Sequence, residues 1–331
     1  MKIGFHSFQM GQRGTEICLH KYAKYNREIL GNESVIISSI AHPTYCLDRF
    51  KDFDVILYPE YWINDGKNDS LRQKLELICD RNKIDAFYAI KMGENDGIMP
   101  TNVKTLTHCV FRMDDPHGTV YAGVCKYMSE KHGGVHPYVH HILEKDAPHI
   151  EDDFREEFGI PKGDLVLGRH GGYETFNIDF TYGAISKALS SRKDLWFVFL
   201  NTKEFISHER VIYLPWTMDV EYKSRFINTC DAMMHGRLDG EVFSLSLAEF
   251  SFRNKPIITW NPKEVPWFHD TGHIYLMKDK AIYYEDENEL YTILTNLDQN
   301  KIKDYDWDEY CYSYTKESVM KEFNEVFLNG K

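Results

Sequence analysis

The sequence lacks the features of membrane-spanning, secreted and nucleic-acid-binding proteins. No apolar run in its 331 residues approaches the roughly 20 residues that a transmembrane helix needs. Residues 2–5 form a strand-like start where a secreted protein would carry a signal peptide. The seven cysteines form no Cys-x-x-Cys pair, which is typical of reduced core thiols. The formal net charge is −12, without a long Lys/Arg run. We expect a cytoplasmic protein that binds no nucleic acid, and peripheral membrane contact stays open.

The motifs that bind common cofactors and metals are also missing. Residues 11–16 (Gly-Gln-Arg-Gly-Thr-Glu) lack the Gly-x-Gly-x-x-Gly order, and no acidic residue closes the strand-like run 35–39, which disfavours a nicotinamide dehydrogenase. There is no Walker A sequence and no His-Glu-x-x-His. His132, His136 and His140 recur at helical spacing among five histidines that end at His149, but glycines and a proline interrupt that helix. We expect no cofactor and no metal.

The chain is long enough for two domains, and 43% hydrophobic and 14% aromatic residues can fill two cores. Short apolar runs alternate with runs of helical period, which predicts α/β domains with parallel sheets. We expect strands within residues 3–8, 35–39, 55–58, 85–89, 103–111, 165–168, 196–200 and 211–214, and helices within 16–30, 70–84, 179–190 and 220–228. A charged segment interrupts the alternation, so we place domains at 1–160 and 161–305, with a helical run 306–328 that packs back on the first domain.

Two glutamates in the second domain occupy a layout that suits a ligand site. A buried strand leads through Gly240 to Glu241, and a helix carrying Glu249 is followed by another buried strand. The seven-residue gap alone says little, because it recurs twice between Glu309 and Glu325 in a polar helical run that reads as solvated. Glu241 differs because it lies at a strand-to-helix turn.

Anion-binding groups are predicted beside this turn. The backbone N–H groups of Phe243, Ser244 and Leu245 would point at an anion at the start of the helix. Arg169 closes the first strand of the second domain before a glycine pair, and a guanidinium can hold a phosphate bidentately. The alternative is a solvated loop arginine.

The first domain offers weaker candidates. Gly14, Thr15 and Glu16 open the first helix after the first strand, where backbone N–H groups can meet an anion or a sugar, although the turn could simply need its glycines. His108 closes a strand-like run and would project into the crevice between the domains. Its alternative is a buried histidine satisfied by the backbone.

Together these residues resemble a GT-B glycosyltransferase of family 4. The second domain of that family carries Glu-x7-Glu in a segment reading roughly Glu-Gly-Phe-Gly-x-x-x-x-Glu, followed by a small apolar strand. Residues 240–249 (Gly-Glu-Val-Phe-Ser-Leu-Ser-Leu-Ala-Glu) and 255–258 (Lys-Pro-Ile-Ile) match this segment. The resemblance implies two Rossmann-like domains that face each other across a cleft, an acceptor-binding first domain, a donor-binding second domain, and retaining, metal-independent transfer.

The resemblance also implies a role for each candidate residue. Glu241 would bind the hydroxyls of the donor sugar, and Glu249 the ribose of the nucleotide. His108 would support the donor sugar. The diphosphate would be held by Arg169, Gly171, Gly172 and the N–H groups around Phe243 and Ser244, and the acceptor loop would be formed by Gly14, Thr15 and Glu16.

The sequence departs from the family pattern at two places. The family carries a lysine five or six residues after the arginine, where this chain has Glu174 and Thr175. The small Pro-Ser pair before the first glutamate is replaced by residues 235–237 (His-Gly-Arg), so Arg237 becomes a second candidate for a phosphate or acceptor contact. We expect a transferase that moves a sugar from a nucleotide diphosphate to a glycan or lipid-linked acceptor. The alternatives are a GT-B epimerase and a module that binds a glycan or a partner without catalysis.

Overall fold

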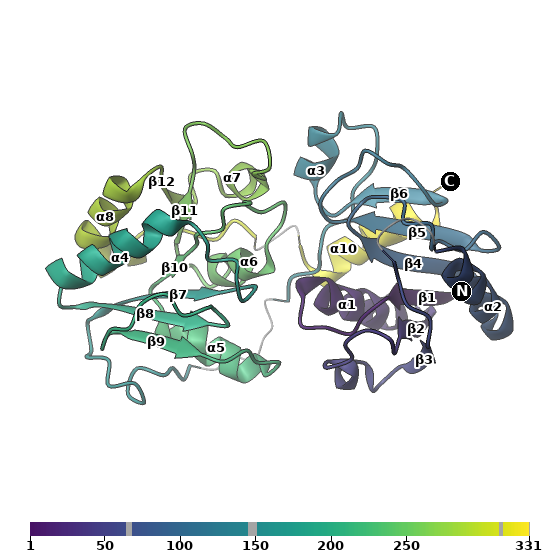
Figure 1. Cartoon of the computed structure of the whole chain (residues 1–331), viewed down its shortest axis with the longest axis horizontal. Helices are drawn as coiled ribbons and strands as arrows, with labels where there is room; N and C mark the ends of the chain where they lie inside the picture. The colour runs from purple at the N-terminus through teal and green to yellow at the C-terminus, as the bar shows by residue number, and fades with distance from the viewer. Residues whose placement is uncertain (64–67, 145–150, 311–313, 331) are drawn as a thin grey trace. The chain divides into compact units, whose positions relative to one another are not determined.

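The chain folds into two compact units, shown in a computed structural model that describes residues 1–63, 68–144, 151–310 and 314–330 (Figure 1). Unit 1 comprises Met1–Ile142 and Tyr312–Lys331, and unit 2 comprises Leu143–Cys311. In the described part of the chain, no helix has the length and apolar character required to cross a bilayer.

Unit 1 is built on a six-stranded sheet with the order β3-β2-β1-β4-β5-β6, in which every pair of neighbours is parallel. Its strands are β1 (Lys2–Ser7), β2 (Glu33–Ser39), β3 (Asp54–Tyr58), β4 (Ala86–Lys91), β5 (Lys104–Cys109) and β6 (Val120–Gly123). Its helices are α1 (Gly14–Glu28), the 3-10 turn η1 (Leu47–Phe50), α2 (Asp69–Asn82), α3 (Lys126–Lys131), α10 (Lys316–Phe323) and the π-helical turn η2 (Asn324–Leu328).

Helices cover both faces of this sheet, so its strands carry continuous apolar runs rather than alternating ones. Phe87 and Tyr88 are neighbours on β4 and therefore point to opposite faces. Phe87 belongs to the cluster formed with Leu75 of α2. Tyr88 packs with Tyr22 of α1 and Phe323 of α10, whose rings stack at 5.5 Å.

Unit 2 repeats the plan with the order β12-β11-β10-β7-β8-β9, again with only parallel neighbours. Its strands are β7 (Leu165–His170), β8 (Leu195–Leu200), β9 (Val211–Leu214), β10 (Ala232–Met234), β11 (Ile257–Trp260) and β12 (Ala281–Tyr284). Its helices are α4 (Asp179–Ser191), α5 (Val220–Thr229), α6 (Leu245–Ser251), α7 (Gly272–Met277), α8 (Glu287–Asn296) and α9 (Gln299–Lys303).

The two sheets share the doubly wound order in which the direction of winding reverses at the first strand. The reversal lies between β1 and β4 in unit 1 and between β7 and β10 in unit 2. Ligands of such sheets bind beyond the carboxyl ends of the strands at this reversal point. The predicted α/β class with parallel sheets is confirmed, and the relevant edge of unit 2 is where β7 and β10 end.

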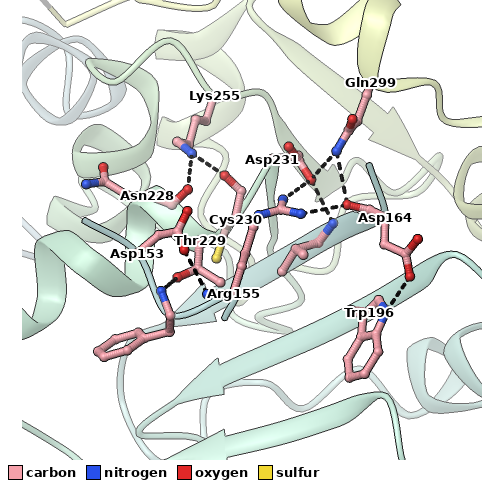
Figure 2. A network of polar contacts seen from close by, with 12 residues as sticks. Asp153, Arg155, Asp164, Trp196, Asn228, Thr229, Cys230, Asp231, Lys255 and Gln299 are labelled. Carbon is pink, nitrogen blue, oxygen red and sulfur yellow. Dashed lines mark hydrogen bonds and ion pairs between the residues drawn. The ribbon is translucent and has the colours of Figure 1, made fainter. Parts of the chain in front are cut away.

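Residues 151–160 belong to unit 2 and not to the first domain, where the sequence placed them. The N–H of Phe154 donates to Thr229 Oγ1 at 2.8 Å. Arg155 reaches Asp231 Oδ2 at 2.7 Å and the carbonyl of Asp164 at 2.8 Å (Figure 2). The same carboxylate oxygen accepts from the Val166 N–H, at the start of β7. These polar contacts attach the segment to the amino ends of β7 and β10.

The C-terminal run is helical over a shorter range than the expected 306–328. Helix α10 begins at Lys316 because the Thr315 side chain caps it, accepting from the Ser318 N–H at 3.2 Å. The run ends on unit 1, where the Lys104 ammonium donates to the carbonyls of Leu328 and Gly330 at 2.9 and 2.7 Å. The earlier part, represented by Trp307, belongs to unit 2.

We expect Asp231→Ala to lower the free energy of unfolding by about 2 kcal/mol, because a half-buried carboxylate that compensates Arg155 and the Val166 N–H is lost. Asp194→Ala is the control, since Asp194 pairs with Arg192 but its side chain is 51% exposed, and its cost should stay below about 1 kcal/mol. Guanidinium unfolding followed by circular dichroism measures both. Equal losses would contradict the anchoring role of Asp231.

Candidate functional site

A close backbone contact fixes the turn that carries Glu241. Gly240 has φ +64°, and a Cβ at this position would overlap the carbonyl oxygen of Asp270. The Glu241 N–H donates to that same carbonyl at 3.0 Å, and the His273 N–H donates to the Glu241 carbonyl at 3.0 Å. Glycine is required because it tolerates both the left-handed backbone and the close approach. Asp270, just before α7, and His273, in its first turn, therefore bond the N–H and the carbonyl of Glu241 and fix the turn after β10.

The Glu241 carboxylate is surrounded by nitrogen groups. Arg237 Nη1 lies 3.0 Å from Oε2, and His235 Nε2 lies 3.7 Å from Oε1. Burial acts to raise the pKa of Glu241, but His235, Arg237 and His273 together hold it below its ordinary value. The side chain keeps 15% of its surface exposed. Glu241 is thus an ionised acceptor that a hydroxyl-bearing ligand can reach.

Glu249 is held by two other groups. Lys223 Nζ of α5 lies 2.5 Å from Oε1, and His170 Nε2 at the end of β7 lies 3.0 Å from Oε2. Burial opposes ionisation, yet Lys223 and His170 keep the pKa of Glu249 well below its usual range. Burial also lowers the pKa of His170, which favours the uncharged ring at neutral pH. A ligand hydroxyl bound to Glu249 would share the carboxylate oxygens with Lys223 and His170.

Arg169 is a buried cation at the end of β7. Its side chain donates to Thr202 Oγ1 at 2.6 Å and to Thr175 Oγ1 at 2.5 Å, and the residue is only 3% exposed. Burial lowers its pKa to about 10, and the charge of Glu241 acts in the opposite sense, so it stays protonated at neutral pH. Among the described residues, no carboxylate lies within ion-pair distance of Arg169. A buried charge with only neutral partners favours the binding of an anion.

The glycine pair allows the loop to close over this guanidinium. A Cβ at Gly171 would come within 2.9 Å of Arg169 Nη2, and one at Gly172 within 2.9 Å of Thr175 Cγ2. Arg169 Nη2 also donates to the Gly172 carbonyl at 3.1 Å. The other candidate arginine, Arg237, is the counterion of Glu241 in this structure.

The expected N–H groups are shifted along the chain. Helix α6 begins at Leu245 with Ser244 as its N-cap, and its first intrahelical bond runs from the Ala248 N–H to the Ser244 carbonyl, so the N–H groups that the helix itself does not bond belong to residues 244–247. Phe243 precedes the helix, and its ring meets Tyr310 edge to face at 6.0 Å. Of the three residues predicted to present N–H groups, Ser244 and Leu245 are at the start of the helix and Phe243 is not.

In unit 1 two predicted residues point into the core. His108 is fully buried, with Nδ1 2.7 Å from the Tyr88 hydroxyl and Nε2 2.8 Å from the Val139 carbonyl. Burial lowers its pKa to about 4, so it is neutral. The expectation that His108 projects into a crevice is not met, because both ring nitrogens are satisfied inside the unit. His108 is instead a buried histidine bonded to the backbone, which was the alternative that the sequence left open.

The loop residues of unit 1 lie at the start of α1, as the sequence suggested. Gly14 is the first residue of the helix and is exposed, and Thr15 follows it. Glu16 is 1% exposed, and its carboxylate accepts from Thr15 Oγ1 at 2.9 Å and from Gln9 Nε2 at 3.2 Å. Burial raises the pKa of Glu16. Gly14 and Thr15 are the accessible members of this set.

The histidine series does not form a cluster. His140 Nδ1 pairs with Glu322 of α10 at 3.0 Å, whereas the His136 ring meets Tyr121 edge to face at 5.1 Å. In the described ranges, no three His, Cys, Asp or Glu side chains are grouped so that they could hold a metal ion. His149 lies outside the described residues.

Strand geometry explains the partners that sequence reasoning missed. Arg169 and His170 are neighbours on β7, so they point to opposite faces of the sheet. Arg169 joins the α4 face through Thr175, and His170 meets the rings of Phe226 and Phe250 on the α5 and α6 face. Because side chains alternate between the two faces along a strand, the sequence could have indicated that His170 faces the side of β7 opposite to Arg169. No local pattern identifies Lys223, Asp270 or His273, which come from distant segments.

Solved structures share this fold, whereas sequence comparisons find no relatives. No protein-family model and no curated protein matches the chain. HepE of Anabaena in complex with UDP-glucose superposes with TM-score 0.68 at 13% identity, over 99% of this chain and 95% of that chain. WaaG, a glycosyltransferase involved in lipopolysaccharide biosynthesis, gives TM-score 0.68 at 10% identity, over 98% of this chain and 99% of that chain.

An epimerase-like structure is similar as well. A putative UDP-N-acetylglucosamine 2-epimerase from Listeria monocytogenes gives TM-score 0.60 at 11% identity, over 100% of this chain and 97% of that chain. At such identities the likeness concerns the fold. The chain therefore has the GT-B fold of two Rossmann-like units that these proteins share.

We expect Gly240→Ala to lower the free energy of unfolding by at least about 1 kcal/mol more than Gly159→Ala does. Both glycines have φ near +65°, but nothing lies within 4 Å of a Cβ at Gly159, whereas a Cβ at Gly240 overlaps Asp270. Thermal and urea unfolding measure the difference. If both variants lost the same stability, backbone strain alone would explain Gly240 and the contact with Asp270 would be unimportant.

We expect Glu249→Gln to lower the Tm by about 5 °C near neutral pH, since the charge-assisted bond from Lys223 and the close contact with His170 are weakened. The depressed pKa means that the ionised form stabilises the fold above about pH 4.3, the unfolded value, and that this contribution disappears as the pH falls toward the folded pKa. The Tm difference should therefore shrink below about pH 4.3. Calorimetry of wild type, Glu249→Gln and the exposed control Glu209→Gln tests this, and a pH-independent difference would refute it.

Proposed function

We propose that this chain is a glycosyltransferase, which moves a sugar from a nucleotide-diphosphate sugar to a glycan or lipid-linked acceptor. The observation that carries the proposal is the presence of two opposite charges, not paired with each other, at the carboxyl ends of β7 and β10. Arg169 is a buried cation that no carboxylate of the described residues contacts, and Glu241 is an ionised carboxylate with an accessible edge. A nucleotide sugar carries the two matching parts, a diphosphate and a ring of hydroxyl donors.

The charge of each side chain indicates which part of a nucleotide sugar it would bind. Arg169 would stabilise the negative charge that develops on the departing diphosphate, with Gly171 and Gly172 allowing the phosphates to approach the backbone. Glu241 would accept hydrogen bonds from the donor sugar, oriented by Arg237, and Glu249 would accept from the ribose. Because the protein supplies this positive charge, we propose transfer without a metal ion and, from the resemblance to family 4, with retention. The first turn of α1, at Gly14 and Thr15, is our candidate for an acceptor contact.

An epimerase is the second candidate, supported by the fold likeness to the Listeria monocytogenes protein. The two activities give different products. An epimerase converts a nucleotide sugar into its isomer without an acceptor, whereas a transferase releases the nucleotide diphosphate by slow hydrolysis of the donor. A module that only binds a glycan or a partner would do neither. Incubation with UDP-, GDP-, ADP- and dTDP-sugars, followed by separation of nucleotides and sugar isomers, distinguishes the three activities.

We also propose that the protein is located in the cytoplasm.

Donor binding is measured independently by thermal shift. A ligand that binds only the folded state at 100 times its Kd stabilises it by about 2.7 kcal/mol. Absence of a shift with every nucleotide sugar and every free nucleotide diphosphate would count against the proposal, because Arg169 and Glu241 would then have another purpose.

We expect Glu241→Gln to reduce transfer or donor hydrolysis by at least about 100-fold while the fold is retained, because an ionised acceptor is replaced by an amide of the same shape. Glu209→Gln, whose side chain is 85% exposed in the parent protein, should leave the rate unchanged. Rates come from nucleotide release, and circular dichroism verifies the fold. Unchanged turnover in Glu241→Gln would exclude Glu241 from the site.

A further inference from the structure

The loop between β11 and α7 in unit 2 can be followed in Figure 1. Several apolar side chains of this loop are exposed to solvent. Trp267 is 96% exposed, and Phe268 and Val265 are 41% and 51% exposed. The Trp267 and Phe268 rings meet edge to face with centroids 5.8 Å apart. A large indole in water forgoes the free energy of burial, and contiguous exposed apolar side chains commonly mark a recognition surface. We call these three residues the loop patch.

The base of this loop is bonded to the turn that carries Glu241. The His269 ring donates from Nδ1 to the Leu238 carbonyl at 2.7 Å, and the Asp270 N–H donates to the Asp239 carbonyl at 2.7 Å. The Asp270 carbonyl in turn accepts from the Glu241 N–H. Three peptide units separate Trp267 from Asp270, so their Cα atoms lie within roughly 11 Å of each other. The backbone of Trp267 is therefore held close to the residue that bonds the Glu241 turn.

The loop itself is restrained. Pro262 and Pro266 fix two backbone φ angles, and the His269 N–H donates to the Pro266 carbonyl at 2.9 Å, which closes a turn around Trp267. A restrained loop loses little conformational entropy when a ligand binds to it. This favours a role in recognition over that of a loose connection.

The charges around the loop patch indicate which occupant it fits. Lys263 is paired with Glu285 at 3.0 Å, and Glu264 and Asp270 are the other charged residues of the loop. With a net charge of −12 in the whole chain, this surface offers no excess positive charge to an anionic membrane or a nucleic acid. An uncharged occupant with one apolar face and one hydroxyl-rich edge fits better. A sugar ring has this character, and an indole offers a flat apolar face with a polar N–H at its rim.

We propose that Trp267, backed by Phe268, stacks against a sugar ring of the acceptor. The inference rests on the proposed transferase function and narrows it to an acceptor that contains carbohydrate beside the bond to be formed. Glu241 is then free to hold the donor sugar, and the loop sets the distance between the two sugars. Trp267 is a binding residue for the acceptor and takes no part in donor binding.

The test is glycan binding by three variants. Trp267→Ala removes the ring, Trp267→Phe keeps a flat aromatic face, and Val265→Ala is the control that alters the same loop patch without touching an aromatic ring. The probes are di- and tetrasaccharides of glucose and of N-acetylglucosamine with α and β linkages, titrated in calorimetry against the full chain. We expect Trp267→Ala to weaken binding about tenfold or more, with Trp267→Phe close to wild type and Val265→Ala unchanged. Donor hydrolysis and the thermal shift with nucleotide sugars should be the same in all four proteins.

Three outcomes would overturn the inference. One is glycan binding that is equal in wild type and Trp267→Ala, and another is the absence of binding by wild type to every probe. The third is loss of binding to phosphatidylcholine vesicles in Trp267→Ala with glycan binding intact, which would assign the loop patch to a membrane. If glycan binding depends on Trp267 but no nucleotide sugar binds or is hydrolysed, the proposed function fails and the sugar-stacking role stands.

Discussion

The backbone contact between Gly240 and Asp270 is the constraint on which the candidate site depends. It joins the turn after β10 to the loop before α7, two segments separated by 30 residues, through a bridge that tolerates no side chain at position 240. This contact fixes the position of Glu241, because the N–H and the carbonyl of Glu241 are bonded to Asp270 and His273. The carboxylate is therefore preorganised by backbone geometry, and its reach does not depend on a flexible turn. The same contact places the loop patch around Trp267 at the edge of the site.

Charge compensation then separates the two glutamates that looked alike in the sequence. Glu249 has a partner on each oxygen, Lys223 and His170, and is held firmly in the ionised form. Glu241 has one arginine and more distant imidazoles, so its charge is compensated less fully, while the two side chains are similarly exposed, at 15% for Glu241 and 19% for Glu249. Arg169 is the complementary case, a buried guanidinium bonded to hydroxyl and carbonyl oxygens. An anionic ligand with hydroxyl donors would bond to both Arg169 and Glu241, and this is the basis of our proposal that a nucleotide sugar binds at this edge of the sheet.

Much of the fold followed from local sequence pattern, and the failures have identifiable causes. Long buried strands such as β2 and β8 and capped helices such as α5 were anticipated within a few residues. Strand β6 was missed because its four residues follow a turn-rich segment and carry no alternation of their own. The boundary near residue 160 was misplaced because the polar segment around Arg155 looks like a linker in sequence, whereas Asp231 and Thr229 bind it to unit 2. His108 closes a strand as expected, but partners from Tyr88 and Val139 turn it into a core residue.

By itself the sequence determined the two parallel α/β units, the turn at Gly240, and side-chain types that are able to bind an anion and hydroxyl groups. These depend on hydrophobic period, glycine placement and the chemistry of single side chains, all of which are local. Only the tertiary structure decided which charges meet. It paired Arg237 with Glu241 and Lys223 with Glu249, and it brought the aromatic loop to the Glu241 turn. It also surrounded Arg169 with hydroxyl and carbonyl oxygens, with no contacting carboxylate in the part of the chain that the structure describes. The physical reason is that electrostatic and backbone contacts between distant segments are set by strand order and packing, which no short stretch of sequence encodes.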